Sequence, residues 1–486
     1  GYALAEVRAM SPADWPTLDA ALRSLAQSLP RGRMPRAYLG QQNYWTLVGV
    51  DRGAANSALV SEDGAIEPRR AGPSLEPYVV DERGAVTGWS GAVAEHALRN
   101  GYLPLPQARF VAPEHTLAVE VGAEGSPERS QLIARYTLTN TTARPRTMTL
   151  ALALRPWQVN PPTQFLNTTG GASAVRRVEW ARGTLRVDGR DWLHAQAAPS
   201  AVTAAAFDHG DPLDLPALPP LTTLDDPQGL ASAVLRWRTE LAPGASRSVY
   251  VVLPLAGNAM LPKDPRVQLD AVAQGWQQRL DRVTLALPPA ARPLADTLRS
   301  ALAHILMSRD GAALQPGTRS YARSWVRDGA MMVAGLLRLG ETDTAREFVQ
   351  WYAQQLFATG KVPCCVDARG ADPVAENDSH GQYIYMVAEL WRHTRDTKMI
   401  DPLWPGVDAA ARYMELLRQS QRTPAQQRTP FWGLMPASIS HEGYSAKPMH
   451  SYWDDFWALA GYRDAARLAQ IFAPTARAAE LARQRD

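Results

Sequence analysis

The chain has 486 residues, which is enough for about three domains at roughly 150 residues each. Lys and Arg number 51 and Asp and Glu 48, so the formal net charge of +3 is too small to indicate a dedicated nucleic-acid binder. With 45% hydrophobic and 20% charged residues the composition is globular, which excludes a disordered chain, and no apolar stretch reaches the roughly 18 residues that would span a membrane.

Residues 1–37 are predicted to form an N-terminal helical arm. Asp14 is a suitable N-cap for one short amphipathic helix. The apolar stripe of this helix consists of leucines three or four positions apart, Leu18, Leu22, Leu25 and Leu29. We expect this segment to act as a packing arm.

Residues 38–260 consist of short β-branched runs separated by Gly, Pro, Asp and Asn, the pattern of strands joined by turns. The segment predicts strands at residues 44–50, 117–121, 131–139, 147–154 and 248–253, and a hairpin turn at Arg182-Gly183. Since strands are many and helical stretches almost absent, we expect a large antiparallel β-sandwich domain.

Residues 261–288 are predicted to be a helical linker, with a helix over 267–282 whose apolar stripe is unlike a flexible tether. From residue 289 to residue 486 the apolar period is helical. The predicted helices cover residues 293–308, 326–339, 342–358, 381–394, 399–420, 452–472 and 474–484.

A long polar loop with aromatic residues precedes every second predicted helix, at residues 315–327, 362–380 and 429–451. Repeated helix hairpins of this kind predict an α/α toroid, in which such loops gather at one mouth. About seven helices correspond to the first half of an (α/α)6 barrel. The chain opens at Gly1 instead of Met and closes inside a predicted helix, which is typical of a processed or truncated piece.

The first loop ends in Trp325, Arg327 and Asp328. An adjacent Arg and Asp offer donors and an acceptor to vicinal hydroxyls, and Trp325 supplies an apolar wall. The alternative is an ordinary helix start, with Asp328 on the helix dipole and Arg327 paired locally.

The second loop carries Glu376 and three candidates for substrate contact, Asp378, His380 and Gln382. A plain capping box with Asp378 as the N-cap would explain part of this run, but the density of titratable groups exceeds what a cap needs. No second His or Cys lies at metal-ligand spacing from His380, so we expect it to be a hydrogen-bonding residue of the cleft or core.

The third loop contains Glu442 on a segment rich in aromatic residues, where apolar walls raise a carboxyl pKa as a general acid requires. The alternative is that Glu442 is a solvated loop residue. Further candidates for substrate contact in and after this loop are Trp432, Tyr444, Lys447 and Trp453. Asp454 and Asp455 are most simply caps of the next helix.

The sequence has no Gly-x-Ser-x-Gly elbow, no Walker lysine loop and no dinucleotide fingerprint, so serine-hydrolase, nucleotide and hydride chemistry have no support. The only cysteines, Cys364 and Cys365, are adjacent, which excludes a long-range disulfide and an ordinary zinc cluster. We therefore expect no metal and no cofactor. Two free cysteines do not decide between a cytoplasmic and a periplasmic location.

Taken in order, these loops resemble the catalytic half of the glucoamylase and glucodextranase family and of its relatives, the cellobiose and chitobiose phosphorylases. Trp325-Val326-Arg327-Asp328 matches the Trp-x-Arg-Asp motif of that family, whose Arg and Asp hold the hydroxyls of the terminal sugar. Asp378 lies where the family has an Asp-Gly turn, and Glu442 lies where it carries its general acid. The similarity covers about residues 296–469.

The resemblance implies an inverting, exo-acting glycoside hydrolase that acts on an oligo- or polysaccharide, with Glu442 as the general acid and Arg327, Asp328 and Asp378 on the terminal sugar. Two departures accompany it. His441 precedes Glu442 where the family usually has Trp, and the second carboxylate of the family has no counterpart before Asp486. Because inverting hydrolysis needs two carboxyl groups about 6.5–9.5 Å apart, the base would come from a second chain or a C-terminal fragment that completes the barrel.

Two other functions stay open from the sequence. In a disaccharide phosphorylase inorganic phosphate would replace the water and the base, and Lys447 and His450 are the basic groups available for it. A non-catalytic carbohydrate-binding protein would need no base at all.

Overall fold

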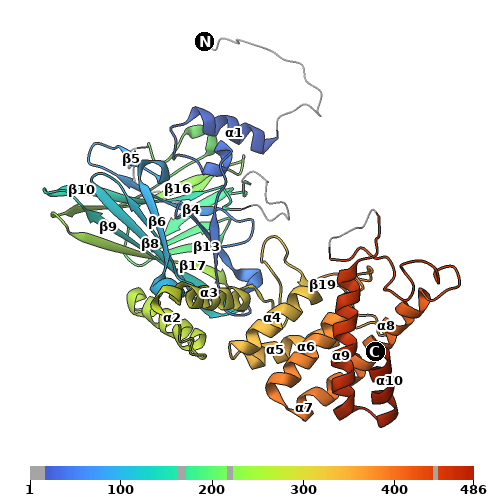
Figure 1. The fold of residues 1–486 in the computed structure, drawn as a ribbon. Helices are drawn as coiled ribbons and strands as arrows, with labels where there is room; N and C mark the ends of the chain where they lie inside the picture. The colour runs from blue at the N-terminus through green and yellow to red at the C-terminus, as the bar shows by residue number, and fades with distance from the viewer. Residues whose placement is uncertain (1–16, 161–170, 216–222, 442–446) are drawn as a thin grey trace, which may run out of the picture. The chain divides into compact units, whose positions relative to one another are not determined.

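The computed structural model describes residues 17–160, 171–215, 223–441 and 447–486 (Figure 1). They form two compact units. The first, here the β unit, is the described part of Gly1–Val50 together with Ala55–Trp276. The second, here the helical unit, is Asp51–Ala54 together with the described part of Gln277–Asp486.

The β unit contains two antiparallel sheets. The eight-stranded sheet runs in the order β1 (Trp45–Val48), β2 (Ala58–Ser61), β3 (Ile66–Glu67), β4 (Ser74–Val80), β10 (Arg146–Arg155), β16 (Ser232–Leu241) and β14 (Ala201–Ala205), and β5 (Val86–Thr87) pairs with β4. The nine-stranded sheet runs in the order β15 (Thr223–Asp225), β11 (Arg177–Ala181), β12 (Thr184–Val187), β13 (Arg190–Ala195), β17 (Ser246–Ala256), β9 (Arg129–Asn140), β8 (His115–Ser126), β7 (Pro106–Val111) and β6 (Val93–Leu98).

The two sheets share one hydrophobic core, which confirms the predicted β-sandwich. Tyr136 and Leu138 of β9 belong to the same buried cluster as Leu150 and Leu152 of β10, on the other sheet. Each predicted strand overlaps an observed one. The predicted hairpin turn joins β11 to β12, because both Arg182 and its neighbouring glycine adopt the positive φ that such a two-residue turn needs.

The N-terminal arm is a helix, α1 (Leu18–Ser28), as predicted. Its N-cap is Thr17, whose hydroxyl accepts a hydrogen bond from the Ala20 N–H at 3.2 Å, whereas Asp14 lies outside the described residues. Leu22 of α1 is buried in a cluster with Trp157 of the β unit, so the arm packs as expected.

The helix predicted at 267–282 is observed as α2 (Pro265–Leu280), and it crosses the division between the units at Trp276. The helical unit then contains α3 (Arg292–Ser308), α4 (Val326–Arg338), α5 (Thr342–Ala353), α6 (Ser379–Thr394), α7 (Thr397–Ile400), α8 (Trp404–Ser420), α9 (Tyr452–Phe472) and α10 (Thr475–Arg485). Among the described residues, no helix is long and apolar enough to cross a lipid bilayer.

Two helix predictions were wrong in detail. The helix expected at 342–358 ends at Ala353, and the chain enters a turn in which the Phe357 N–H donates to the Lys361 carbonyl at 3.0 Å. The helix expected at 399–420 is divided into α7, a short 3-10 turn and α8, because Pro402 lacks an N–H and its ring clashes with the preceding helical turn.

Helix α6 lies at the centre of the helical unit, packed against α4, α8 and α9. Two glycines permit its close contact with α9. A Cβ atom at Gly381 would lie 2.0 Å from the Trp457 carbonyl oxygen, and one at Gly461 would lie 2.8 Å from the Gly381 Cα. This approach draws the N-terminal ends of α6 and α9 together, and these ends carry several of the predicted site residues.

An ion-pair network explains why Asp51–Ala54 belongs to the helical unit. The Asp51 carboxylate contacts Arg309 Nε at 2.6 Å and Arg279 Nη1 at 2.7 Å. Burial alone would raise the pKa of Asp51, but these two guanidinium groups hold it below its ordinary value. These ion pairs therefore stabilise the fold at pH values above the ordinary pKa of an aspartate.

We expect Asp51→Asn to lower the free energy of unfolding by on the order of 1.5–3 kcal/mol at pH 7, because it removes the carboxylate that joins two partly buried guanidinium groups, which keep Glu341 and Glu347 as their other partners. Since the folded-state pKa of Asp51 is depressed, the difference from wild type should shrink as the pH falls below about 4. Urea unfolding at several pH values measures both effects. Asp343→Asn, which removes an exposed partner of Arg346, is the matched control and should change little. Equal stability of the two variants would contradict the assignment.

Candidate active site

The structure joins the three predicted loops. Strand β18 (Ser324–Trp325) pairs with β19 (Cys365–Asp367), which pairs with β20 (Gly370–Ala371), so the first loop is tied to the second. The second loop is tied to the third by two hydrogen bonds. The Asn377 amide donates to the Pro436 carbonyl at 2.8 Å, and the Ile439 N–H donates to the Ala375 carbonyl at 3.1 Å.

Arg327 lies where the first two loops meet. Its Nη1 atom is 3.0 Å from Glu376 Oε2 and 3.3 Å from Asp378 Oδ2. The alternative in which Arg327 pairs within its own helix start is therefore wrong, because its ion pairs reach a loop about 50 residues further along the chain. One cation is thus shared between two carboxylates.

Asp378 occupies the N-cap position of α6, but its side chain makes no capping hydrogen bond, so the capping-box alternative is wrong. Its Oδ2 atom instead accepts from Trp453 Nε1 and from Gln382 Nε2, each at 2.8 Å. The side chain is fully buried, and Oδ1 has no hydrogen-bond partner within the described part of the chain. A buried acceptor of this kind favours a ligand hydroxyl or a water as its partner.

Asp454 is a third buried carboxylate at this site, and the expectation that it caps α9 was wrong. Ser438 Oγ donates to its Oδ2 and Ser440 Oγ to its Oδ1, both at 2.8 Å. Burial, with a smaller contribution from the Asp378 charge, raises the pKa of Asp454 to about 6. We call Glu376, Asp378 and Asp454 the carboxyl cluster.

Asp455 lies next to the carboxyl cluster but has a different partner. Asp455, also expected as a cap, accepts the Met435 N–H at 2.8 Å and so fixes the third loop.

Burial raises the pKa of Asp328, and the adjacent Arg327 opposes this shift. Burial also raises the pKa of Glu376, and the charges of Asp378 and Asp454 add to the shift while Arg327 opposes it.

Two predicted aromatic residues border the site. Trp325 is half-buried, and its ring lies 5.8 Å from that of Tyr321. Trp453 lies 4.6 Å from the His441 ring, measured between centroids, while its indole N–H reaches Asp378. Trp432 and Lys447 are both exposed in the third loop.

His380 is buried and belongs to the core of the helical unit. Its Nδ1–H donates to the Asn377 carbonyl at 3.3 Å, and its ring stacks on Tyr413 at 5.0 Å. Burial lowers the pKa of His380 to about 4, so the ring is neutral at pH 7. The structure thus gives His380 a hydrogen bond in the core, and its contact with a substrate stays a prediction.

His441, the residue before Glu442, is linked to the carboxyl cluster. The single hydroxyl proton of Ser440 is donated to Asp454, so His441 Nδ1 donates to Ser440 Oγ across 3.1 Å. Ser440 also adopts a positive φ of 49°, an uncommon conformation for a residue with a side chain. Glu442 and Tyr444 themselves lie outside the described residues.

His450, one of the two basic groups considered for phosphate, already has a partner. Its Nδ1–H donates to the Met435 carbonyl at 2.9 Å, and its ring stacks on Phe431 at 4.2 Å. These contacts give the ring a structural role in the third loop.

Among the residues that the structure describes, Cys364, Cys365 and Asp372 could together hold a metal, since their possible ligand atoms lie within 4.8 Å of one another. These three side chains are poorly suited to bind a metal ion, for two reasons. Asp372 already accepts from Arg323 at 2.8 Å. The hydrogen bond between the two thiols and their burial raise the pKa of Cys364, whereas a metal requires the thiolate.

The roles of Ser438 and Ser440 were not predicted. Nothing in the sequence indicates that two serines of an irregular loop donate to an aspartate more than a dozen residues further on. The sequence carries one indication that an aspartate here has another role. Two adjacent aspartates, Asp454 and Asp455, stand at the start of α9, and a helix start needs only one capping residue.

No protein-family model and no curated protein matches the chain by sequence. In fold it is similar to a bacterial glucoamylase complexed with acarbose, with a TM-score of 0.60 and 10% identity over 92% of this chain and 66% of that chain. The chain therefore spans slightly less than two thirds of the glucoamylase. A putative kojibiose phosphorylase from the human microbiome matches with a TM-score of 0.39 and 8% identity over 90% of this chain and 60% of that one. A rhamnosidase from Klebsiella oxytoca matches with a TM-score of 0.33 and 13% identity over 85% and 69%.

The predicted resemblance to glucoamylases is thus found at the level of the fold. The class of protein is a β-sandwich followed by a helical unit, and the bacterial glucoamylase is one solved member of that class.

Asp454 generates a testable pH effect. Because its folded-state pKa of about 6 exceeds the ordinary value of 3.8, the folded state holds a proton that the unfolded state releases between about pH 4 and pH 6. Stability from this group therefore falls as the pH rises through that window, by on the order of 2–3 kcal/mol. The isosteric variant Asp454→Asn should lack this decline, as measured by urea unfolding from pH 4 to pH 8. An identical pH slope in the two proteins would contradict the raised pKa.

Proposed function

We propose that this protein is a carbohydrate-active enzyme, an inverting and exo-acting glycoside hydrolase in which Arg327, Asp328 and Asp378 hold the terminal sugar. The observation that carries the proposal is the shared arginine. Arg327 bridges Glu376 and Asp378 where the first two loops meet, and the Trp453 indole donates to the same Asp378. Alternating donors and acceptors beside indole faces are suited to the vicinal hydroxyls and apolar face of a pyranose.

In this proposal each side chain has a distinct task. The Arg327 guanidinium donates to sugar hydroxyls, Asp328 accepts from them, and Asp378 offers its unpartnered Oδ1. Trp325 and Trp453 exclude water from the apolar ring face. Glu442 protonates the leaving-group oxygen, and its neighbour His441 is held next to the carboxyl cluster by Ser440 and Trp453.

We further propose that additional helices, from a second chain or a C-terminal fragment, complete an (α/α)6 barrel and supply the catalytic base. An apolar stripe on α9 supports this proposal. Tyr452, Phe456 and Leu459 recur at four- and three-residue spacing and are 69%, 66% and 54% exposed. A stripe of this size is suited to pack against further helices.

Glu442→Gln tests the proposed acid. The variant keeps the size and hydrogen bonding of the side chain but lacks the proton, so turnover of an unactivated glycoside should fall by about 10²–10⁴-fold while substrate still binds. The loss should be smallest for an activated glycosyl fluoride. The assay uses the complete protein, with and without inorganic phosphate, and Glu240→Gln on β16 as the matched control. Equal rates of wild type and Glu442→Gln would remove Glu442 from the mechanism, and an absolute requirement for phosphate would indicate a phosphorylase.

Asp328→Asn tests the sugar-binding role with little risk to the fold. Since a hydrogen bond to a charged group contributes about 1.5–3 kcal/mol, affinity for the terminal sugar should fall by roughly 10- to 150-fold with the melting temperature nearly unchanged. Calorimetric titration with a non-hydrolysed thio-oligosaccharide measures the affinity. Unchanged affinity together with a large loss of melting temperature would show that Asp328 is structural.

A further inference from the structure

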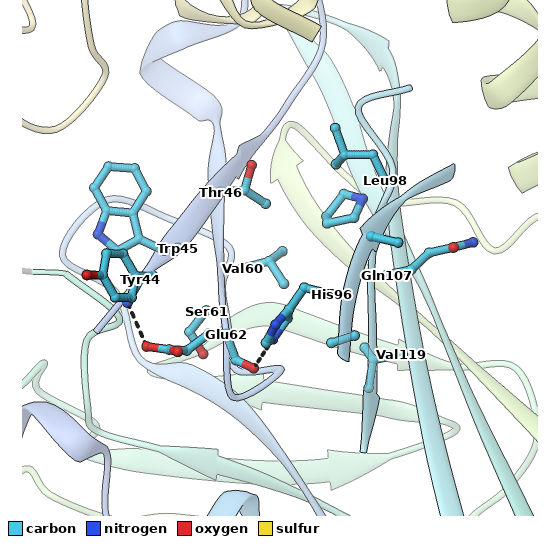
Figure 2. Close-up of a pocket in the computed structure, with 13 residues that line it drawn as sticks. Tyr44, Trp45, Thr46, Val60, Ser61, Glu62, His96, Leu98, Gln107 and Val119 are labelled. Carbon is cyan, nitrogen blue, oxygen red and sulfur yellow. Dashed lines mark hydrogen bonds between the residues drawn. The ribbon is translucent and has the colours of Figure 1, made fainter. Parts of the chain in front are cut away.

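A cavity of about 480 Å³ opens in the β unit, lined entirely by residues of the sandwich (Figure 2). It lies between β1, at the edge of the eight-stranded sheet, and β6, at the edge of the nine-stranded sheet. The volume falls within the range of about 300–1,000 Å³ that is typical of small-molecule sites.

The floor of this cavity is apolar and comes from both sheets. Val60 of β2, Ala108 of β7 and Val119 of β8 are all buried. A ligand that enters the cavity therefore removes apolar surface from water on two sides, which favours binding.

The rim carries two exposed aromatic side chains. Tyr44 and Trp45 are adjacent in the chain and are 63% and 39% exposed, and they lie close together on the same side of the cavity in Figure 2. Their π faces are electronegative, so they attract the slightly positive C–H groups of a saturated ring. A single exposed aromatic residue would need no explanation, but two at the mouth of a cavity indicate a binding platform.

Polar groups at the rim are fixed by hydrogen bonds. His96 Nε2 donates to the Glu62 carbonyl at 2.7 Å and so crosses from one sheet to the other, as the dashed line in Figure 2 shows. The Gln107 amide donates to Glu120 at 2.7 Å. The Gln107 amide points away from the cavity (Figure 2), whereas His96 Nδ1 and the hydroxyl of Thr46 keep further hydrogen-bonding capacity within the described part of the chain.

The charged group at the rim is the Glu62 carboxylate, whose partner Arg36 is shared with Asp63. The Glu62 carboxylate accepts the Tyr44 N–H at 2.9 Å and pairs with Arg36 at 3.3 Å. An anionic ligand would meet the Glu62 carboxylate, and a purely apolar ligand would leave the rim acceptors desolvated without partners. The lining favours a neutral molecule with one apolar face and several hydroxyl groups.

We propose that this cavity is an accessory carbohydrate site that binds one or two pyranose units of a neutral oligosaccharide. The inference rests on the proposed function, because it assumes that the same protein acts on a carbohydrate. The site shares no residue with the carboxyl cluster, so it holds a sugar without catalysis.

The test uses the full chain labelled with 5-fluorotryptophan and observed by fluorine NMR. The Trp45→Phe variant assigns the Trp45 signal, and Trp325→Phe and Trp453→Phe assign signals that report on the candidate active site. Titration with maltotriose, cellotriose or mannotriose should shift the Trp45 signal for at least one sugar. The Asp328→Asn variant should keep the Trp45 response, so failure of the active-site proposal and failure of this one are distinguishable.

Tyr44→Ala should weaken the Trp45 response by at least fivefold in affinity without loss of melting temperature, because Tyr44 is mostly exposed. Tyr250→Ala, on β17 outside the cavity, is the matched control and should leave the response unchanged. No Trp45 shift with any of the three sugars would overturn the proposal. A Trp45 shift with 8-anilinonaphthalene-1-sulfonate in place of the sugars would overturn it in favour of an apolar ligand.

Discussion

The ion pairs of Arg327 are the interaction on which the rest of the candidate site depends. Asp378 is fully buried, and Glu376 is nearly so, yet both lie next to the same guanidinium nitrogen. Without that cation, each carboxylate would be charged in an environment that cannot solvate it, and removing one partner of a buried pair commonly costs about 3–5 kcal/mol. Arg327 therefore adds a charged link between the first and second loops to the strand pairing of β18 with β19.

The glycine contact between α6 and α9 explains why the carboxyl cluster is so deeply buried. Gly381 and Gly461 let the two helix backbones approach more closely than any side chain at either position would allow. Asp378 and Trp453 precede or open these helices, so the same approach brings the Trp453 indole within hydrogen-bond distance of Asp378. Close packing, rather than any unusual residue type, thus produces the raised pKa of Asp454.

Local patterns in the sequence were sufficient to predict most helices and strands, because capping residues and apolar periods act over only a few positions. They also placed Asp378 correctly at the start of a helix. They did not indicate what its side chain contacts, since Trp453 lies 75 residues further along the chain. The small sheet that ties Trp325 to Cys365 was missed for a related reason: a two-residue strand has no period to detect. The role of Glu442 as general acid stays a prediction. The structure describes its neighbour His441, which contacts Ser440 and Trp453.

The charge of the site separates the proposed hydrolase from its nearest alternative. A phosphorylase must hold a dianion in the cleft, and this requires cations that are free of other partners. The Arg327 guanidinium is already shared between two carboxylates and His450 donates to a backbone carbonyl, so the exposed Lys447 is the remaining basic group considered for phosphate. Phosphate at this place would meet the negative field of Glu376, Asp378 and, above pH 6, Asp454. A neutral sugar meets no such repulsion, because its hydroxyl groups donate to carboxylates and accept from the guanidinium. The cluster therefore accommodates a polyol, which a hydrolase and a phosphorylase would both bind, and its opposition to phosphate is the physical argument behind our proposal of hydrolysis.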